Sequence, residues 1–468
     1  MRAMPGSSFS DRAGTARPAQ SFLFLQGPIS PFFRRLGRAL AARGHAVLRV
    51  NLCAGDWVFW HGPDSTSYRG ELAGWGAHVG ALMDRRAVTD LVLLGEQRPY
   101  HVAAIAEARR RGITVTVTDY GYLRPDWITL EHDGMSAQSH LPRTPEGIRA
   151  VAADAPPPDL TPRFGDSFAA QARWDVAYHL LSSLLWVLYP GYRSHQIHHP
   201  VLNYLGTGLR LLRRRRMAAR AAAKLAELRA AGTSYWVFAM QMEVDYSIRA
   251  YSPFDDMTMP LRQTIGSFAR AAPADAVLVV KLHPLDPGLR PWPRLIRQLA
   301  TTAGAAGRVR FVDGGSLEDM LASARGLVTV NSTVGVWAIR QGVRLCVLGH
   351  ALYDIPGLTF QGGLDRFWAE AAPPDPALAA DFIRAISDTI HIRGVYYADP
   401  GLAEAVTAAA ARLDAAASQA MAARMVRAGG GAACAPLVPA ARPRATGPGQ
   451  RDRRALPVPA FDANPQKL

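Results

Sequence analysis

A candidate catalytic carboxylate follows a β-branched run in the first half of the chain. The run Ile113 to Thr118 leads directly into Asp119, and the segment Gly121 to Glu131 comes next. A β-branched run that ends at an acid and a glycine predicts a buried strand that delivers a carboxylate to a turn. Ligands of α/β folds bind at the carboxyl ends of parallel strands, so Asp119 is a candidate acid or base and Arg124 a candidate anion contact. An aspartate that only caps the next helix is the alternative, and Asp119 taken by itself favours it.

Polar side chains also follow three predicted strands in the second half of the chain. They are Gln241 and Asp245 after strand 235–240, Lys281, His283 and Pro284 after strand 276–282, and Asn331, Ser332, Thr333 and Gly335 after strand 327–330. A histidine held by a rigid proline can donate to a phosphate without a full charge, and hydroxyls at a helix N-terminus form an anion site. Each cluster by itself also fits a polar loop or an ordinary helix cap. Three such clusters at successive strand ends of one domain favour a functional site.

The first half adds further candidates near the ends of its own elements. They lie in Gln26-Gly27-Pro28, Gly55-Asp56-Trp57 and Arg98-Pro99-Tyr100-His101. Gly27 would permit a ligand to approach the backbone closely, because glycine has no Cβ. The chain contains neither GxGxxG nor GxxxxGK[ST], so the sequence indicates neither dinucleotide nor P-loop chemistry.

The elements that must position these residues alternate between short apolar strands and helices. Strands are predicted at 21–25, 46–50, 91–94, 113–118, 235–240, 276–282, 309–312, 327–330 and 345–348, and helices at 31–43, 101–111, 260–271, 291–302, 317–324 and 334–341. This alternation predicts α/β domains with parallel sheets and right-handed crossovers. Two similar halves predict two Rossmann-like domains facing a cleft, which is the glycosyltransferase-B arrangement and is shared by other two-domain α/β enzymes.

Composition shifts suggest where these domains begin and end. We expect a flexible leader at 1–20, a first domain at 21–150, a linker and helical region at 151–230, a second domain at 231–395, a helix at 396–428 and a disordered tail at 429–468. The leader has no apolar core, so we expect no secretory signal. No apolar run reaches the ~18–20 residues that a membrane span needs.

Net charge limits the classes of binding partner, and cysteine usage indicates the redox compartment. The 468-residue chain carries a net charge of +15, which suits nucleic acid, an acidic membrane surface, nucleotide sugars or acidic sugars. Cys53, Cys346 and Cys434 lack metal or disulfide spacing, which indicates a reducing compartment. A metal-like spacing occurs at His195, His198 and His199, but Pro200 breaks the helix and no acid or cysteine completes the set, so metal binding is disfavoured.

Two further segments have more than one interpretation. The basic run Arg213–Arg216 fits a solvated helix face or a contact with anionic lipid. An RNA contact is disfavoured because neither an RNA-binding fold nor interleaved aromatic residues surround the run. The apolar segment Val176–Tyr189, with Trp174 just before it, could supply interfacial groups to a membrane. Packing of Val176–Tyr189 inside the first domain is the alternative, and it is the favoured one.

Together these segments resemble the bacterial capsule polysaccharide synthesis and export family, in particular its β-Kdo transferases, which start the lipid-linked capsule anchor (Kdo is 3-deoxy-manno-octulosonic acid). The resemblance spans about residues 20 to 400 and rests on 24–28, 31–35, 55–60, 121–131, 241–245, 281–284, 331–335 and 349–368. The string from Gly121 to Glu131 is long and distinctive, whereas the His283-Pro284 pair is not.

The resemblance implies a glycosyltransferase-B enzyme that transfers Kdo from CMP-Kdo with a β linkage and without a metal or other cofactor. Asp245 would meet the anomeric carbon, and Asp119, which stands where the family pattern has Glu, would be the general acid/base. A mechanism that retains the configuration at the anomeric carbon can use two such carboxylates, one as nucleophile and one as acid/base. The CMP-sugar side would comprise Gln241, Lys281, His283, Pro284, Asn331, Ser332, Thr333 and Gly335. The sugar or acceptor side would comprise Gln26, Gly27, Asp56, Arg98, Gly121 and Arg124.

The same resemblance implies where the enzyme works and with what. We expect a cytoplasmic protein, peripheral at the inner face of the cytoplasmic membrane, that uses a (lyso)phosphatidylglycerol-type acceptor and meets other capsule synthesis proteins but no nucleic acid. One alternative is the same fold with another CMP- or UDP-sugar. Others are a capsule-assembly protein that has lost catalysis and a basic nucleic-acid-binding protein. The presence of Asp119, Asp245, His283 and Ser332 favours catalysis.

Overall fold

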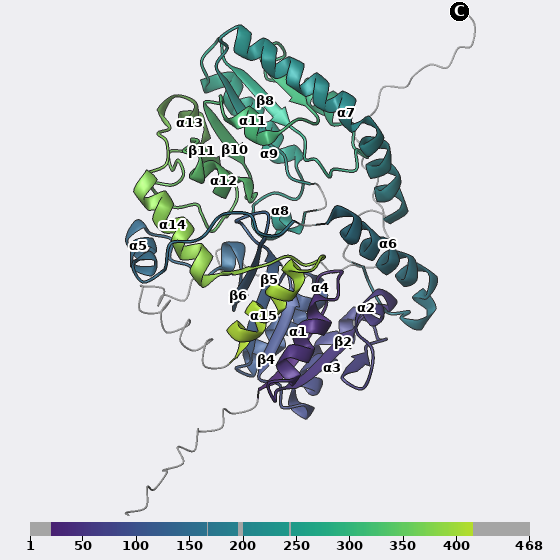
Figure 1. The fold of residues 1–468 in the computed structure, drawn as a ribbon. Helices are drawn as coiled ribbons and strands as arrows, with labels where there is room; N and C mark the ends of the chain where they lie inside the picture. The colour runs from purple at the N-terminus through teal and green to yellow at the C-terminus, as the bar shows by residue number, and fades with distance from the viewer. Residues whose placement is uncertain (1–19, 166, 195–199, 243–244, 415–468) are drawn as a thin grey trace, which may run out of the picture.

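Two β-sheets, each with helices packed on both faces, form the two halves of the protein (Figure 1). The computed structural model describes residues 20–165, 167–194, 200–242 and 245–414. Side chains alternate between the two faces of each sheet. In β1 (Ser21–Phe24), Phe22 and Phe24 pack on one face, while Leu23 packs on the other. This period of two is what a strand buried on both faces requires, and it confirms the predicted α/β class.

Sheet A belongs to the first domain and has the strand order β12-β6-β5-β4-β1-β2-β3. Its other strands are β2 (Ala46–Asn51), β3 (Ser65–Ser67), β4 (Asp90–Leu94), β5 (Thr114–Tyr120), β6 (Trp127–His132) and β12 (His391–Arg393). β1 to β5 are parallel, whereas β6 runs antiparallel to β5. Its helices are α1 (Phe32–Ala41), α2 (Ala54–Phe59), α3 (Leu72–Arg85) and α4 (Pro99–Arg110).

Sheet B belongs to the second domain, has the order β11-β10-β7-β8-β9 and is parallel throughout. Its strands are β7 (Tyr235–Ala239), β8 (Val277–Lys281), β9 (Val309–Val312), β10 (Gly326–Thr329) and β11 (Leu345–Val347). Its helices are α8 (Tyr246–Ala250), α9 (Thr258–Ala271), α10 (Trp292–Thr302), α11 (Leu317–Leu321), α12 (Val334–Arg340), α13 (Leu364–Glu370) and α14 (Pro376–Thr389).

The helical region between the domains consists of α5 (Pro145–Ala153), α6 (Phe168–Leu184), the 3₁₀ turn η2 (Trp186–Leu188) and α7 (Pro200–Ala230). α6 lies beside α2 of the first domain, and α7 runs from there along the second domain (Figure 1). In the described ranges, no helix is both long and apolar enough to cross a membrane.

The chain crosses between the two domains more often than the sequence predicts. Residues 391–393, which the sequence places at the end of the second domain, instead pair with β6 as strand β12 of sheet A. The following helix α15 (Gly401–Leu413) packs on α1, and Tyr396 and Leu402 join the aromatic core around Phe22. Conversely, α5 packs against α14 of the second domain. Local patterns define each element but not the sheet that it joins.

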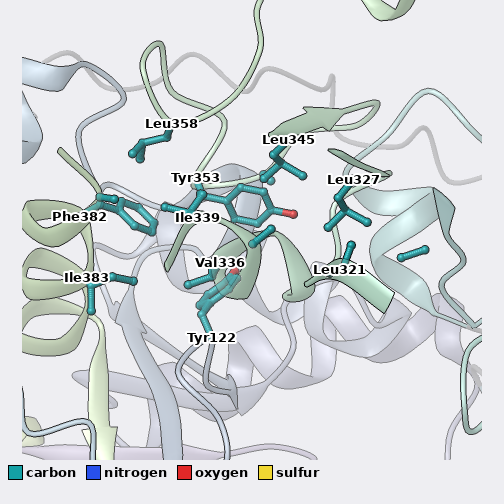
Figure 2. Close-up of a cluster of buried hydrophobic side chains, with 14 of the residues drawn as sticks. Tyr122, Leu321, Leu327, Val336, Ile339, Leu345, Tyr353, Leu358, Phe382 and Ile383 are labelled. Atoms are coloured by element: carbon teal, nitrogen blue, oxygen red, sulfur yellow. The ribbon is translucent and has the colours of Figure 1, made fainter. Parts of the chain in front are cut away.

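The distinctive segment from Gly121 to Glu131 contains the turn and most of the second arm of a β-hairpin that links the domains. β5 and β6 form its arms, so Asp119 caps no helix, contrary to the favoured alternative. A Cβ on Gly121 would overlap the carbonyl group of Trp127 across the turn, so only glycine fits there. Tyr122 and Leu123 at the turn enter the hydrophobic core of the second domain, where Tyr122 lies beside Val336 (Figure 2).

Several predictions concern residues outside the described ranges. These include the leader up to residue 19, His195, His198 and His199, the tail 429–468 with Cys434, and the part of the predicted helix 396–428 that follows residue 414.

Two buried glutamates lie where the hairpin meets the second domain. Glu96 follows β4 and accepts a hydrogen bond from the Tyr251 hydroxyl of the second domain, and Glu131 on β6 accepts one from Ser139. Burial raises the pKa of Glu96 from 4.5 to about 7, against the opposing effect of the Tyr251 hydrogen bond. Burial raises the pKa of Glu131 to about 8, and the negative charge of Glu96 adds to this increase.

These raised pKa values predict that the free energy of unfolding falls as pH rises. A folded-state pKa above the ordinary value means that the folded protein holds the proton more tightly, so this stability is present in acid and is lost between about pH 4.5 and 8. We expect Glu96→Gln or Glu131→Gln to reduce the loss by on the order of 3 kcal/mol each. Urea unfolding at both ends of this pH range, with the exposed Glu404→Gln as control, measures it. A pH dependence equal to that of wild type in both variants would contradict the assignment.

Candidate active site at the domain boundary

Two half-buried carboxylates from different domains lie in one electrostatic environment. Asp119 ends β5, and Asp245 begins α8. Burial raises the pKa of Asp119, and the negative charge of Asp245 raises it further. The backbone N–H of Tyr120, 2.7 Å from Oδ1 of Asp119, opposes this increase, as do the positive charges of Arg98 and Arg124. The structure therefore brings together both predicted catalytic acids and both predicted anion contacts.

A network of amide groups holds Asp245 in place. Oδ1 of Asp245 accepts a hydrogen bond from the Ser247 backbone N–H at 2.9 Å, which caps α8. The Gln241 amide nitrogen lies 3.4 Å from the other carboxylate oxygen, and 2.8 Å from Oδ1 of Asn331. The Asn331 backbone N–H donates to the Gln241 side chain in return, at 3.0 Å. Gln241 and Asn331 are buried, so they tie the ends of β7 and β10 together and position Asp245.

His283 is arranged as a neutral hydrogen-bond donor. Its Nδ1 accepts the Leu285 backbone N–H at 3.1 Å, which leaves the proton of the neutral ring on Nε2. Burial lowers the pKa of His283 to about 4; the charge of Asp245 opposes this, whereas Lys281 and Arg124 reinforce it. Because Asp245 and Arg124 both influence the ring, His283 lies in the same environment as the two carboxylates.

Arg210, which the sequence did not single out, braces the loop that carries His283. Its guanidinium donates to the carbonyl oxygens of Pro284, at 3.4 Å, and of Asp286. It also pairs with the carboxylate of Asp313, just after β9. Arg210 lies on α7 and is far in sequence from the loop, so only the packing of α7 on sheet B could identify this contact.

The remaining residues predicted to bind the donor divide into two groups. Ser332 and Thr333 are half-buried at the start of α12, where the Ser332 hydroxyl accepts the Val334 N–H at 3.4 Å, and Pro284 is exposed. Lys281 is buried and donates to the Leu282 carbonyl at 2.9 Å, and burial lowers its pKa to about 8. A Cβ on Gly335 would overlap the ring of Tyr353. Lys281 and Gly335 therefore already have structural roles within the second domain.

Three of the predicted sugar or acceptor contacts also have structural roles. Asp56 is buried and pairs with Arg49 at 3.1 Å. The Gln26 amide donates to Asp56 and to the Tyr178 hydroxyl, both at 3.1 Å, and so ties α6 to the loop that follows β1. Gly27 was expected to admit a ligand, but the ring of Phe33 occupies the space where its Cβ would lie.

Arg98 and Arg124 remain accessible beside Asp119. Arg98 is half-buried at the start of α4, and Arg124 is exposed at the hairpin turn. The guanidinium of Arg124 lies 4.9 Å from the centre of the Tyr120 ring. Two guanidinium groups near a half-buried acid can bind a carboxylate or phosphate of a ligand.

Tyr396 is a further contact that sequence reasoning missed. Its hydroxyl donates to the backbone carbonyl of Asp119 at 3.0 Å, and it is 2.6 Å from the Thr118 hydroxyl. This residue reaches β5 only because the chain returns to sheet A after the second domain. Local sequence patterns do not predict that return.

The neutral form of His283 leads to a prediction about CMP binding. If His283 holds the phosphate of CMP, as the family resemblance implies, removal of the Nε2–H donor in His283→Ala should weaken CMP binding by about tenfold to a hundredfold, because hydrogen bonds to a charged group are stronger than neutral ones. Since the pKa of His283 is about 4, NMR of the imidazole should show no titration between neutral and mildly acidic pH. Calorimetry with CMP and the exposed His61→Ala variant as control tests the first part. Unchanged CMP affinity in His283→Ala, or a ring that titrates near neutrality, would contradict the assignment.

Comparisons with known proteins cover most of the chain. Residues 89–397 match the family described as "Capsule polysaccharide biosynthesis protein". The capsule polysaccharide export protein KpsS of Escherichia coli is 31% identical over 391 residues, which cover 81% of this chain and 97% of that protein. The capsule polysaccharide modification protein LipB of Neisseria meningitidis serogroup A is 30% identical over 393 residues, covering 81% of this chain and 92% of the relative.

Among solved structures, the Thermosulfurimonas dismutans KpsC β-Kdo 2,7 transferase aligns with 84% of this chain and 99% of its own. The sequence identity is 14% and the TM-score is 0.40.

Proposed function

The chain belongs to the capsule polysaccharide biosynthesis protein family, and we propose that it is a glycosyltransferase that transfers Kdo from CMP-Kdo to a (lyso)phosphatidylglycerol-type lipid with a β linkage. The observation that carries this proposal is the position of two carboxylates at the domain boundary, Asp119 at the end of β5 and Asp245 at the N-cap of α8, where the charges of Asp245, Arg98 and Arg124 all act on Asp119. A retaining glycosyl transfer uses two carboxylates in different surroundings, one as nucleophile and one as acid/base.

In the first half-reaction, a carboxylate oxygen of Asp245 attacks the anomeric carbon of Kdo. The bond from that carbon to the phosphate oxygen breaks, and CMP leaves with the electron pair. The Nε2–H of His283 and the hydroxyls of Ser332 and Thr333 donate to the phosphate and stabilise its charge. Arg98 and Arg124 hold the carboxylate of the sugar. These donors supply the stabilisation, so the proposed reaction needs no metal ion.

In the second half-reaction, an acceptor hydroxyl displaces Asp245 from the anomeric carbon. Asp119 takes the proton of that hydroxyl as the new bond forms, and Asp245 departs as a carboxylate. Two successive inversions retain the β configuration. A base with a raised pKa accepts the proton more readily than an ordinary aspartate, which is why burial of Asp119 supports this role.

Mass analysis of a reaction with purified protein tests the proposal. We would incubate the chain with fresh CMP-Kdo and a short-chain lysophosphatidylglycerol and expect a product heavier by one Kdo. If there is no product but CMP binds and His283→Ala weakens that binding, the sugar or acceptor belongs to another class. If CMP does not bind, the proposal is wrong and a non-catalytic role in capsule assembly takes its place.

The lipid acceptor places the proposed reaction at a membrane. We propose that the protein works at the inner face of the cytoplasmic membrane, where it would meet other capsule synthesis proteins. The support for this location is the net charge of +15, which suits an anionic surface and anionic substrates.

A further inference from the structure

The outward face of α6 and the turn that follows it expose large apolar side chains. Leu184 is 64% exposed, Trp186 63% and Val187 60%. Val176 and Leu180 precede Leu184 at spacings of four residues, so the three form one stripe along the helix. Contiguous exposed apolar surface of this kind marks an interaction site. The helix lies on the outside of the molecule, beside α2 and the start of α7 (Figure 1).

The inward face of α6 is already packed, so the exposed stripe is a second apolar face. Tyr178 is buried, and its hydroxyl lies 3.1 Å from the sulfur of Cys53. The Ser182 hydroxyl accepts the Gly55 backbone N–H at 3.1 Å. These contacts fix the orientation of the helix on the first domain. The sequence favours burial of Val176–Tyr189 inside that domain, but the structure buries only one side of it.

The next helix along the chain, α7, carries exposed positive charge. α7 is joined to α6 by the hydroxyl of Tyr204, which donates to Asp175 at 2.5 Å. The four residues Arg213–Arg216 are all exposed, and their neighbour Leu212 is 85% exposed. From Val176 to Ala226 the chain contains no aspartate or glutamate. Exposed apolar residues together with a run of exposed cationic residues are the composition of a surface that binds anionic lipid.

We propose that this surface docks on an anionic lipid bilayer. The α6–α7 docking surface comprises Val176, Leu180, Leu184, Trp186, Val187, Leu188, Leu209, Leu212 and Arg213–Arg216. A protein partner with an apolar patch would not require the run of arginines, whereas a bilayer that contains anionic headgroups uses both parts of the surface. Trp186 suits the boundary between headgroups and acyl chains, where tryptophan is enriched.

Both helices of the docking surface also reach the proposed active site. On α6, the Gln171 amide lies 3.3 Å from the Tyr120 hydroxyl, next to Asp119. On α7, Arg210 holds the loop of His283. Docking would therefore bring the site to a lipid surface in a defined orientation. This consequence, although not docking itself, rests on the proposed transfer to a lipid acceptor.

Flotation of the full chain with vesicles tests the docking. We expect binding to phosphatidylcholine vesicles that contain phosphatidylglycerol, and weaker binding to phosphatidylcholine alone. A triple variant with Leu184→Ser, Trp186→Ser and Val187→Ser should bind at least about a hundredfold more weakly, since each large apolar group contributes several-fold or more. Arg→Gln at all four positions 213–216 should reduce binding to anionic vesicles by about fivefold per arginine.

Matched substitutions elsewhere control for apolar content and charge. Val102→Ser with Met259→Ser removes exposed apolar groups from α4 and α9, and Arg294→Gln with Arg297→Gln removes exposed charge from α10. These controls should float as wild type does. Thermal unfolding and CMP binding show whether each variant is folded.

Two results would overturn the docking proposal. One is flotation of the docking variants equal to that of wild type. The other is a wild-type chain that does not float but self-associates through the patch, so that the triple variant becomes monomeric. Dispersed lysophosphatidylglycerol separates docking from catalysis. Docking variants should retain activity on this soluble acceptor and lose it on acceptor within vesicles. Flotation without turnover of either acceptor would contradict the proposed reaction and leave docking intact.

Discussion

Substitution Asp245→Asn is expected to lower the turnover of CMP-Kdo by about a thousandfold or more, with little change in CMP affinity. Loss of the nucleophile from a double-displacement mechanism has an effect of this size or larger. Asparagine is as good a helix cap as aspartate, so α8 and its hydrogen bond from Ser247 should persist. The variant therefore removes the negative charge and the attacking oxygen without removing the local structure.

Kinetics and mass spectrometry of the intact protein would measure this effect. Wild-type protein given CMP-Kdo without an acceptor should gain the mass of one Kdo on Asp245, and Asp245→Asn should not. Asp275→Asn serves as the matched control and should behave as wild type does. Asp275 is exposed and precedes β8, whereas the proposed site lies at the other, carboxyl end of that strand. Turnover at the wild-type rate in Asp245→Asn would contradict the proposed role of Asp245 as nucleophile.

The second large effect concerns Asp119. Asp119→Asn should slow transfer by about a hundredfold to ten-thousandfold, which is the range for a general acid/base. Asp119→Glu should restore part of the rate, because it keeps the carboxylate and extends it by one methylene. A purely structural role for Asp119 predicts instead that the variants follow stability, with Asp119→Asn little affected. Single-turnover rates for the three proteins distinguish these cases.

The pH profile provides a separate test of Asp119. As a base it must be unprotonated, so the rate should fall as pH drops through its raised pKa. Arg98 holds that pKa down, so Arg98→Gln should move the acid limb to higher pH, whereas loss of the Asp245 charge should lower the pKa of Asp119. Carboxyl NMR of Asp245→Asn measures the second shift, and the exposed Arg85→Gln is the control. An acid limb unchanged by Arg98→Gln would show that Asp119 does not set it.

The strands and many of their ends could be predicted from the sequence because the signals are local. Buried parallel strands require short β-branched or apolar runs, and the run at 309–312 coincides with β9. Asp119, Asp245 and His283 could be predicted to lie at such strand ends, and they remain candidates because polar residues there lie at the ligand-binding edge of a parallel sheet. The resemblance of the Gly121–Glu131 string then linked these residues to one family, and the comparisons confirm that membership.

The roles of polar residues inside each domain could not be predicted in the same way. Gln26, Asp56 and Lys281 have the residue types of a binding site, but each is buried and hydrogen-bonded within the protein. Residue type reports what a group can bind, whereas its partner depends on distances that only the folded chain sets. Gly27 and Gly335 follow the same rule, because the side chains that fill the space beside them come from outside their own turns.

The sequence by itself determined the two α/β domains, the strand ends that carry Asp119, Asp245 and His283, and the family. Tertiary structure alone decided that Arg210 braces the His283 loop, that β12 returns to sheet A, and that α6 keeps an apolar face outside. The physical reason is the range of the interactions. Strand and turn preferences act over a few residues, whereas these three features arise from packing between segments far apart in the chain.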